Sequence, residues 1–196
     1  MTGKSHVVVS ICIELSTAAV LFSYKILNAA EVVPSIKIVD LIYDFIFESP
    51  LWIILGGTLF LLGGILPDID IKGSLVSKIF FGLYLPIEHR TWTHTIWAVC
   101  IFLLLSIRLP SIRFLAAGYA LHLVLDSFST SGVCWFYPIE NYRYYKNGAK
   151  VKKGKHIKLY KTNQPAEYII MGIIICLTIV ICVTLVLLQL RVIDAF

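Results

Sequence analysis

The six residues HRTWTH at positions 89–94 stand directly before an apolar run, although they include two histidines, an arginine and two threonines. Further His and Asp residues lie near the ends of other apolar segments, and the full set is His6, Asp68, Asp70, His89, His94, His122 and Asp126. Imidazole and carboxylate groups are common ligands of divalent transition metals. Four His and three Asp exceed the needs of one ion, so they predict either two ions or one ion with a proton-transfer pair.

The spacing of these residues suits a shared site. His122 and Asp126 are four apart, so on a helix they share one face, with Cβ atoms about 6 Å apart. Asp68 and Asp70 flank Ile69 after Pro67 and point the same way if that segment is extended. His89 and His94 are five apart, and we expect a turn there instead of a common helix face.

The elements that must position these residues are membrane helices. Of 196 residues, 58% are hydrophobic and only 15% are charged, which is more apolar than a soluble domain of this length. The sequence predicts an all-α membrane protein, a polytopic bundle of about five transmembrane helices in a single integral membrane domain over residues 1–196. The expected spans are 7–27, 51–66, 95–109, 112–128 and 168–190, with a short interfacial helix at 75–88.

Glu14 interrupts the first apolar segment, and no small-x-small cleavage site follows, so we interpret the segment as a retained span instead of a signal peptide. Its own role has three readings. It can be a carboxylate that orients a histidine, a general base, or a protonated group bonded to a neighbouring helix. We leave Glu14 out of the expected ligand set.

The distribution of charge predicts an orientation. Residues 141–161 contain eight Lys or Arg and no acid, whereas residues 28–50 contain four acids and one lysine. Basic loops remain in the cytoplasm, so we expect a cytoplasmic loop at about 139–167 and a cytoplasmic amino terminus. All seven ligands then lie at cytoplasmic helix ends. The basic loop can also bind anionic headgroups.

Several motifs in the chain resemble those of one family. They are MTGKSH at the start, LPDID followed by Ser74, HRTWTHT, and GYALHLVLDSFSTSGV with Pro138 after it. In order and spacing they resemble the YdjM-like family of bacterial membrane-bound proteins, which are described as metal-dependent hydrolases. The resemblance covers residues 1 to about 140, with Thr95 where the family usually has serine. It implies an inner-membrane location and site residues at His6, Asp68, Asp70, His89, Arg90, Thr93, His94, His122 and Asp126.

These observations favour metal-dependent hydrolysis. Mixed imidazole and carboxylate ligands suit Zn²⁺ or Mn²⁺, which activate water and polarise a scissile group. We take Arg90, Thr93 and Asp70 as candidate catalytic residues. Arg90 can bind an anion or be an interfacial cation, and Thr93 can donate to the same anion or, more simply, cap the third span.

The substrate class follows from location. The chain has no H-E-x-x-H or G-x-S-x-G motif, and a site at headgroup depth favours a phosphoester of a membrane lipid or lipid-linked anion, with no nucleic acid partner. Two alternatives stay open: a divalent-metal carrier or sensor that uses the same ligands without hydrolysis, and a non-catalytic scaffold. The sequence makes no prediction of oligomeric state.

Overall fold

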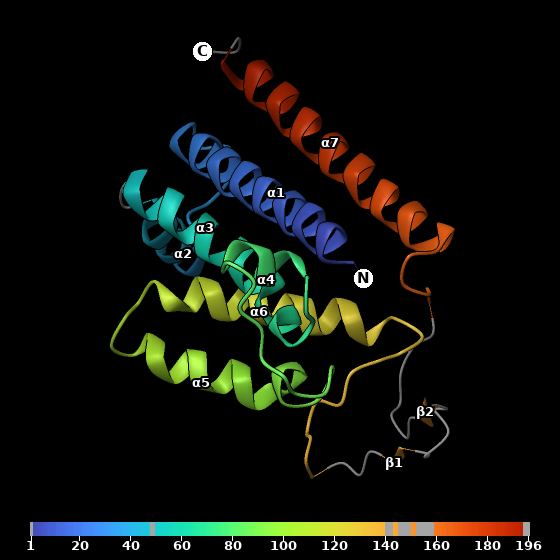
Figure 1. Ribbon diagram of the computed structural model, residues 1–196. Helices are drawn as coiled ribbons and strands as arrows, with labels where there is room; N and C mark the ends of the chain where they lie inside the picture. The colour runs from blue at the N-terminus through green and yellow to red at the C-terminus, as the bar shows by residue number, and fades with distance from the viewer. Residues whose placement is uncertain (1, 48–49, 140–142, 145–149, 152–158, 194–196) are drawn as a thin grey trace.

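The computed structural model describes residues 2–47, 50–139, 143–144, 150–151 and 159–193, and its architecture is helical (Figure 1). Within those ranges, three stretches are long and apolar enough to cross a membrane: Gly3–Ala29, Ile53–Asp70 and Pro165–Arg191. They correspond to helix α1 (Gly3–Ala29), helix α3 (Pro50–Ile65) with the 3-10 helix η1 (Leu66–Asp70), and helix α7 (Pro165–Ile193). The predicted all-α membrane fold is confirmed.

Two further apolar helices, α5 (Ile96–Ser106) and α6 (Ile112–Ser127), occupy the third and fourth predicted spans. At about 1.5 Å per residue they extend roughly 17 and 24 Å, less than the roughly 30 Å of a hydrocarbon core. Helix α5 ends at Ser106, where the backbone changes to turns in which Ile107 N donates to Leu104 and Arg108 N to Leu105, and Pro110, which has no N–H, follows. These two helices are therefore shorter than the spans predicted from hydropathy.

The helices pack in the spatial order α7, α1, α3, α6, α5, which can be followed across Figure 1. Helices α3 and α6 approach closely through Gly63 and Gly118. A Cβ atom on either glycine would collide with a backbone carbonyl of the other helix, that of Leu115 or Phe60. These glycines therefore serve close packing between α3 and α6.

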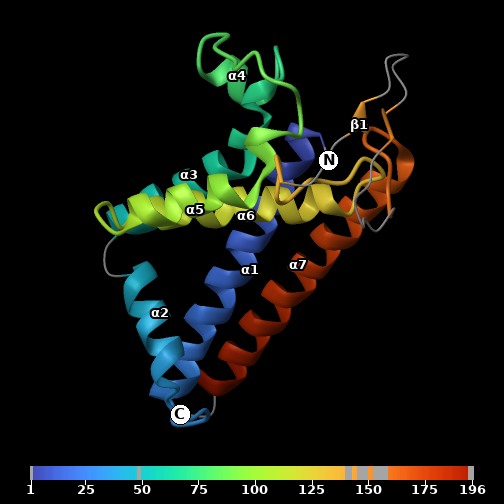
Figure 2. The same cartoon turned by 90° about the horizontal axis from the view of Figure 1, so that it is seen from below.

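Helices α1 and α7 lie side by side and run in the same direction (Figure 2). Near their amino ends, Thr2 N donates to Glu167 Oε1 at 2.7 Å. Near their carboxyl ends, Gln189 Nε2 donates to Ser23 Oγ, also at 2.7 Å. The amino ends of both helices therefore lie at the same end of the molecule.

Helix α2 (Lys37–Phe47) was not predicted, and it lies inside the acidic segment 28–50, between the first two expected spans. It is amphipathic, and Lys25 of α1 holds it through ion pairs to Asp40 at 2.8 Å and Asp44 at 3.5 Å. Asp40 and Asp44, two of the four acids of this segment, thus form contacts between helices.

The predicted interfacial helix at 75–88 is wrong in length. Only α4 (Leu75–Ile79) is helical, because Phe81 and Gly82 have positive φ angles and redirect the chain. In the predicted basic loop, β1 (Arg143–Tyr144) pairs antiparallel with β2 (Lys150–Val151). Residues 140–142, 145–149 and 152–158 of that loop lie outside the described residues.

Candidate metal centre

Four segments bring the seven predicted ligands together at one end of the bundle. These segments are the first turn of α1, the 3-10 helix η1, the loop before α5 with its 3-10 helix η2 (Trp92–His94), and the last two turns of α6. They supply, in that order, His6; Asp68 and Asp70; His89 and His94; and His122 and Asp126. Six of these side chains are buried, and His89 is partly exposed. The structure therefore gathers residues that are up to 120 positions apart in the sequence.

Local structure sets the directions in which His6, Asp68 and Asp70 point. Thr2 caps α1 by accepting a hydrogen bond from Ser5 N at 3.2 Å, which fixes the first turn that carries His6. Asp68 and Asp70 would point the same way only in an extended segment, and the structure places both in the 3-10 helix η1 instead. At roughly 120° per residue, side chains two apart in a 3-10 helix diverge. Asp68 and Asp70 consequently face different partners.

Four ligand atoms form a closed ring. Asp68 Oδ1 lies 3.7 Å from Nε2 of both His94 and His122. Asp126 Oδ2 lies 3.9 Å and 3.8 Å from the same two nitrogens. A first-row ion with bonds of about 2.0–2.2 Å separates neighbouring ligands by roughly 3–3.6 Å. The ring is thus a few tenths of an ångström wider than a metal-bound shell.

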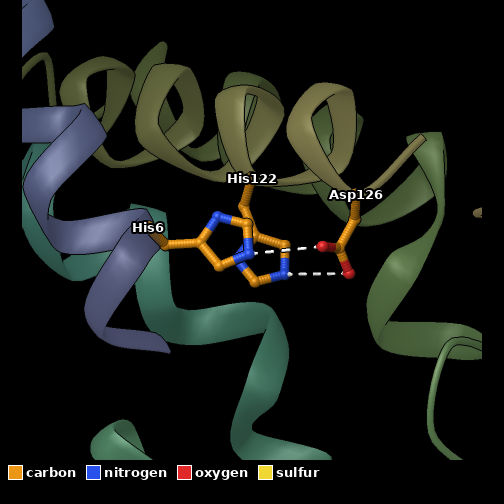
Figure 3. Close-up of side chains that lie close together, drawn as sticks. All are labelled: His6, His122 and Asp126. Carbon is orange, nitrogen blue, oxygen red and sulfur yellow. Dashed lines mark ion pairs between the residues drawn. The ribbon is translucent and has the colours of Figure 1, made fainter. Parts of the chain in front are cut away.

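His6 extends the ring on the α1 side (Figure 3). Its imidazole stacks on that of His122, with ring centroids 3.8 Å apart, and its Nε2 lies 3.3 Å from Asp126 Oδ1. Asp126 therefore presents one oxygen to His6 and the other to His94 and His122.

The buried nitrogens that face the ring lack hydrogen bonds. Nε2 of His6, His94 and His122 has no hydrogen-bond partner among the described residues. A buried polar atom left in this state costs about 1–3 kcal/mol. His122 Nδ1 lies 2.8 Å from the Gly64 carbonyl, so Nδ1 is the protonated donor and Nε2 keeps its lone pair. These unpaired nitrogens beside carboxylates fit a bound cation.

The ligand atoms fall into two neighbouring groups, each with its atoms within 4.8 Å of one another. One group is His6, His122 and Asp126, and the other is Asp68, His89 and His94. Each has mixed nitrogen and oxygen donors, which suit Zn²⁺ or Mn²⁺ better than Mg²⁺. The side chains can hold a divalent metal ion, and their grouping accommodates two.

Asp70 and Thr93 lie behind the ligands. Asp70 Oδ1 is 2.8 Å from His89 Nδ1, and Asp70 Oδ2 accepts a hydrogen bond of 2.6 Å from the Thr93 hydroxyl. The Thr93 oxygen is also 2.9 Å from His94 Nδ1. The interpretation of Thr93 as a helix cap is wrong, because the cap position of α5 is Thr95. Asp70 and Thr93 instead orient the two histidines.

His94 carries the clearest electrostatic signal outside the membrane-spanning segments. Burial disfavours its charged form, but the neighbouring carboxylates of Asp68, Asp70 and Asp126 outweigh burial and raise the pKa of His94 above its ordinary value. In the metal-free protein, a proton on His94 thus partly balances the carboxylates.

Arg90 is buried and fixes Asp126. Its Nη2 lies 2.8 Å from Asp126 Oδ2, and its Nη1 donates to Ser129 Oγ and the Gly132 carbonyl, both at 3.0 Å. Arg90 has a positive φ of 66°, which is uncommon outside glycine and turns the chain between His89 and Thr91. Arg90, which was predicted to bind an anion, therefore also holds the metal-ligand candidate Asp126 in place.

A pocket of about 260 Å³ leads to the cluster. Its floor includes Asp68, His89, Arg90 and Asp126, and its rim includes Lys72 and the amino-terminal end of α1. Small molecules can thus reach both ligand groups from outside the helix bundle.

Sequence reasoning missed several supporting residues. Gly64 contributes only its carbonyl, and Tyr119 donates its hydroxyl to the Thr93 carbonyl. Ser129 and Gly132 lie in the GYALHLVLDSFSTSGV motif, which was the one signal that could have identified them. Glu167 is fully buried and accepts hydrogen bonds from Thr2 N and Asn163 N, at 2.7 and 2.6 Å.

Comparison with known families agrees with this geometry. The family model described as YdjM inner membrane protein matches residues 1–189. The chain belongs to the YdjM inner membrane protein family. No curated protein and no solved structure shows a significant match. Family membership and the three apolar helices place the protein in a membrane, as the sequence predicted.

Proposed function

We propose that this YdjM family protein is a metal-dependent hydrolase that acts at the cytoplasmic membrane face on a phosphoester of a membrane lipid or lipid-linked anion. The observation that carries the proposal is a set of three buried histidine nitrogens that have no hydrogen-bond partner among the described residues. They lie beside Asp68 and Asp126, two carboxylates that line an open pocket. An arrangement with this desolvation cost favours a bound cation over a purely structural role.

Each side chain has a distinct task in this proposal. His6, His94, His122, Asp68 and Asp126 hold the metal, and His89 completes the second group. When bound, Zn²⁺ or Mn²⁺ supplies water activation at neutral pH and polarisation of a phosphoryl oxygen. Asp70 fixes the ring of His89 through Nδ1, and Thr93 fixes the ring of His94 through Nδ1, so that His94 Nε2 faces Asp68 and Asp126.

Positive charge supports an anionic substrate. The guanidinium of Arg90 lies in the pocket floor, and exposed Lys72 lies on its rim. Arg90 is held by Asp126, Ser129 and Gly132, so it keeps a fixed place and does not have to be ordered when a phosphate binds. Lys72 can contact the outer oxygens of the same phosphate.

The test combines metal content with turnover. We expect purified protein to contain Zn or Mn by elemental analysis, and Asp126→Ala to lose most of it. Asp44→Asn is the matched control, because Asp44 is an exposed acid on α2. Metal-loaded protein should release a water-soluble headgroup or phosphate from a panel of labelled lipids, and a chelator should abolish that release.

The same samples separate hydrolysis from ion transport. Metal-loaded protein that releases nothing from the panel, yet moves divalent ions into liposomes, would replace the hydrolase with a carrier. Protein that binds no Zn or Mn, or an Asp126→Ala variant with full metal content, would refute the metal centre itself.

A further inference from the structure

A second cavity lies deeper in the helix bundle, and it shares no lining residue with the pocket above the metal centre. It also measures about 260 Å³ and is bounded by α1, α2, α3 and α6. Apart from Glu14 and Thr17, every described residue that lines it is apolar or a glycine. A molecule that fills it must therefore be mostly apolar.

Glu14 is the exceptional residue of this cavity. Its Oε1 is buried and has no hydrogen-bond partner among the described residues. A carboxyl group inside a membrane helix is costly and is usually retained for a function. The opposite wall is open because Gly57 has no side chain: a Cβ atom there would lie 3.6 Å from Glu14 Oε2. The carboxyl group therefore faces usable space.

The described part of the chain supplies no countercharge to this cavity. None of the twelve lining residues that the structure describes is Lys, Arg or His. On the carboxyl-terminal side of Glu14, the first basic residue of α1 is Lys25, which is paired with Asp40 and Asp44. A negative carboxylate in a wall of low dielectric is stabilised by a cation that arrives with its own apolar body.

We propose that this cavity binds a hydrophobic molecule that carries a single amine. The ammonium group pairs with Glu14, and the apolar portion fills the space between Leu21, Phe60 and Phe114. Such molecules partition into lipid, which is the medium that surrounds these helices. The site is independent of the metal centre and of the proposed hydrolysis.

The experiment uses the full-length protein in lipid nanodiscs with 4-phenylbutylamine as the probe. The matched neutral compound is 4-phenylbutan-1-ol, which has the same carbon skeleton. We expect saturable binding of the amine, with the alcohol weaker by roughly tenfold or more because it cannot form the ion pair. Glu14→Gln keeps the side-chain shape and should weaken amine binding by a similar factor, with little effect on the alcohol.

Two further variants keep the test interpretable. Glu31→Gln changes an exposed acid at the end of α1 and should leave amine binding unchanged. Ala18→Leu narrows the cavity and should weaken both compounds. Helical content by circular dichroism and metal content report whether each variant is folded. Equal amine affinity in Glu14→Gln, equal affinity for amine and alcohol, or no saturable amine binding would each overturn the proposal.

Discussion

Asp70 and Asp126 have the same side-chain group, but their carboxylates contact different residues. Both oxygens of Asp126 face histidine Nε2 atoms, whereas Asp70 contacts His89 Nδ1 and the Thr93 hydroxyl, on the far side of the ligands. An acid that contacts the protonated nitrogen of a ligand acts by fixing the ring. The two aspartates should therefore be distinguishable by mutation.

We expect Asp70→Asn to weaken metal affinity by about 10- to 100-fold, as losses of such outer partners typically do. Asp126→Asn should weaken it more, because it removes a charge that faces three histidines. Competition titrations with a metal-binding dye measure both effects, with Asp44→Asn as the reference. An Asp70 variant that is as defective as the Asp126 variant would show that Asp70 is itself a ligand.

Protonation of His94 makes both the stability of the metal-free fold and the affinity for metal depend on pH. Its pKa is raised in the metal-free protein, so its charged form stabilises the metal-free fold at low pH, and this contribution disappears as pH rises through the raised pKa. Metal needs the neutral imidazole, so its affinity should fall as pH decreases through the same range, by about tenfold per pH unit for one displaced proton.

This pH dependence can be measured by Zn²⁺ titrations between pH 6 and 9. His94→Gln should bind Zn²⁺ more weakly and should release about one proton fewer on binding, because Gln has no proton to lose. The same pH slope in both proteins would mean that other groups account for the linkage.

Sequence reasoning could identify the candidate metal ligands but not the groups that orient them. His122 and Asp126 follow a helical spacing, so their convergence could be predicted from the chain. The Gly64 carbonyl that fixes the His122 tautomer carries no side-chain signal. Asp68 and Asp70 point in different directions because η1 is a 3-10 helix, and the spacing of two residues between them does not predict that conformation.

At the scale of elements, Glu167 joins two helices. Its carboxylate accepts hydrogen bonds from Thr2 N and Asn163 N and ties the start of α7 to the turn that carries His6. We expect Glu167→Ala to lower stability by about 1–3 kcal/mol for each amide left unsatisfied. Glu167→Gln keeps one acceptor oxygen and should be milder.

Thermal unfolding in detergent measures this effect, and metal titration adds a second readout. Because His6 lies in the first turn of α1, Glu167→Ala should also weaken metal binding in protein that is still folded. Unchanged unfolding temperature and metal affinity would show that the link is not required.

The end of α4 and the loop after it expose apolar side chains at Ile79, Phe81 and Leu83, and Phe81 is fully exposed. This loop follows the helix that borders the metal-site pocket, because Leu75 at the start of α4 is one of the residues that line the pocket. Although the helix there is shorter than predicted, an exposed aromatic loop next to a span is expected to lie in the headgroup region.

Phe81→Trp tests this placement. Fluorescence of the added tryptophan, taken as the difference from the parent protein, should be quenched by lipids brominated near the headgroup. Glu88→Trp, at an exposed position after the loop, serves as the reference and should be quenched less. Equal quenching at the two positions would place the loop in water.

Hydropathy predicted helices best where a run was long and uniform. Helix α7 was the clearest case, because 168–190 contains no charge. Helix α2 was missed because the acids Asp40 and Asp44 suggested a segment exposed to water, whereas both carboxylates pair with Lys25. Composition cannot distinguish acids that face water from acids that meet a cation on a neighbouring helix.

At the scale of the whole molecule, the parallel packing of α1 and α7 constrains topology. Hydrogen bonds join Thr2 to Glu167 at one end and Ser23 to Gln189 at the other. If both helices cross the membrane, the amino terminus and the segment before α7 lie on the same side, and the carboxyl terminus lies on the other. This holds whether α5 and α6 cross as a pair or remain on one side.

The direction of that topology is our last prediction. The basic segment at 141–161 precedes α7 and carries eight Lys or Arg and no acid, so it should remain in the cytoplasm together with the amino terminus. A fluorescent protein fused to the amino terminus should be bright, and alkaline phosphatase fused to the carboxyl terminus should be active, because the phosphatase folds only outside the cytoplasm. Exchanging the two reporters should silence both. Two termini on the same side would contradict the parallel pair as two spans. The inverted pattern would retain the pair but place the metal-site pocket on the outer face, and the proposed substrate would then have to come from that leaflet.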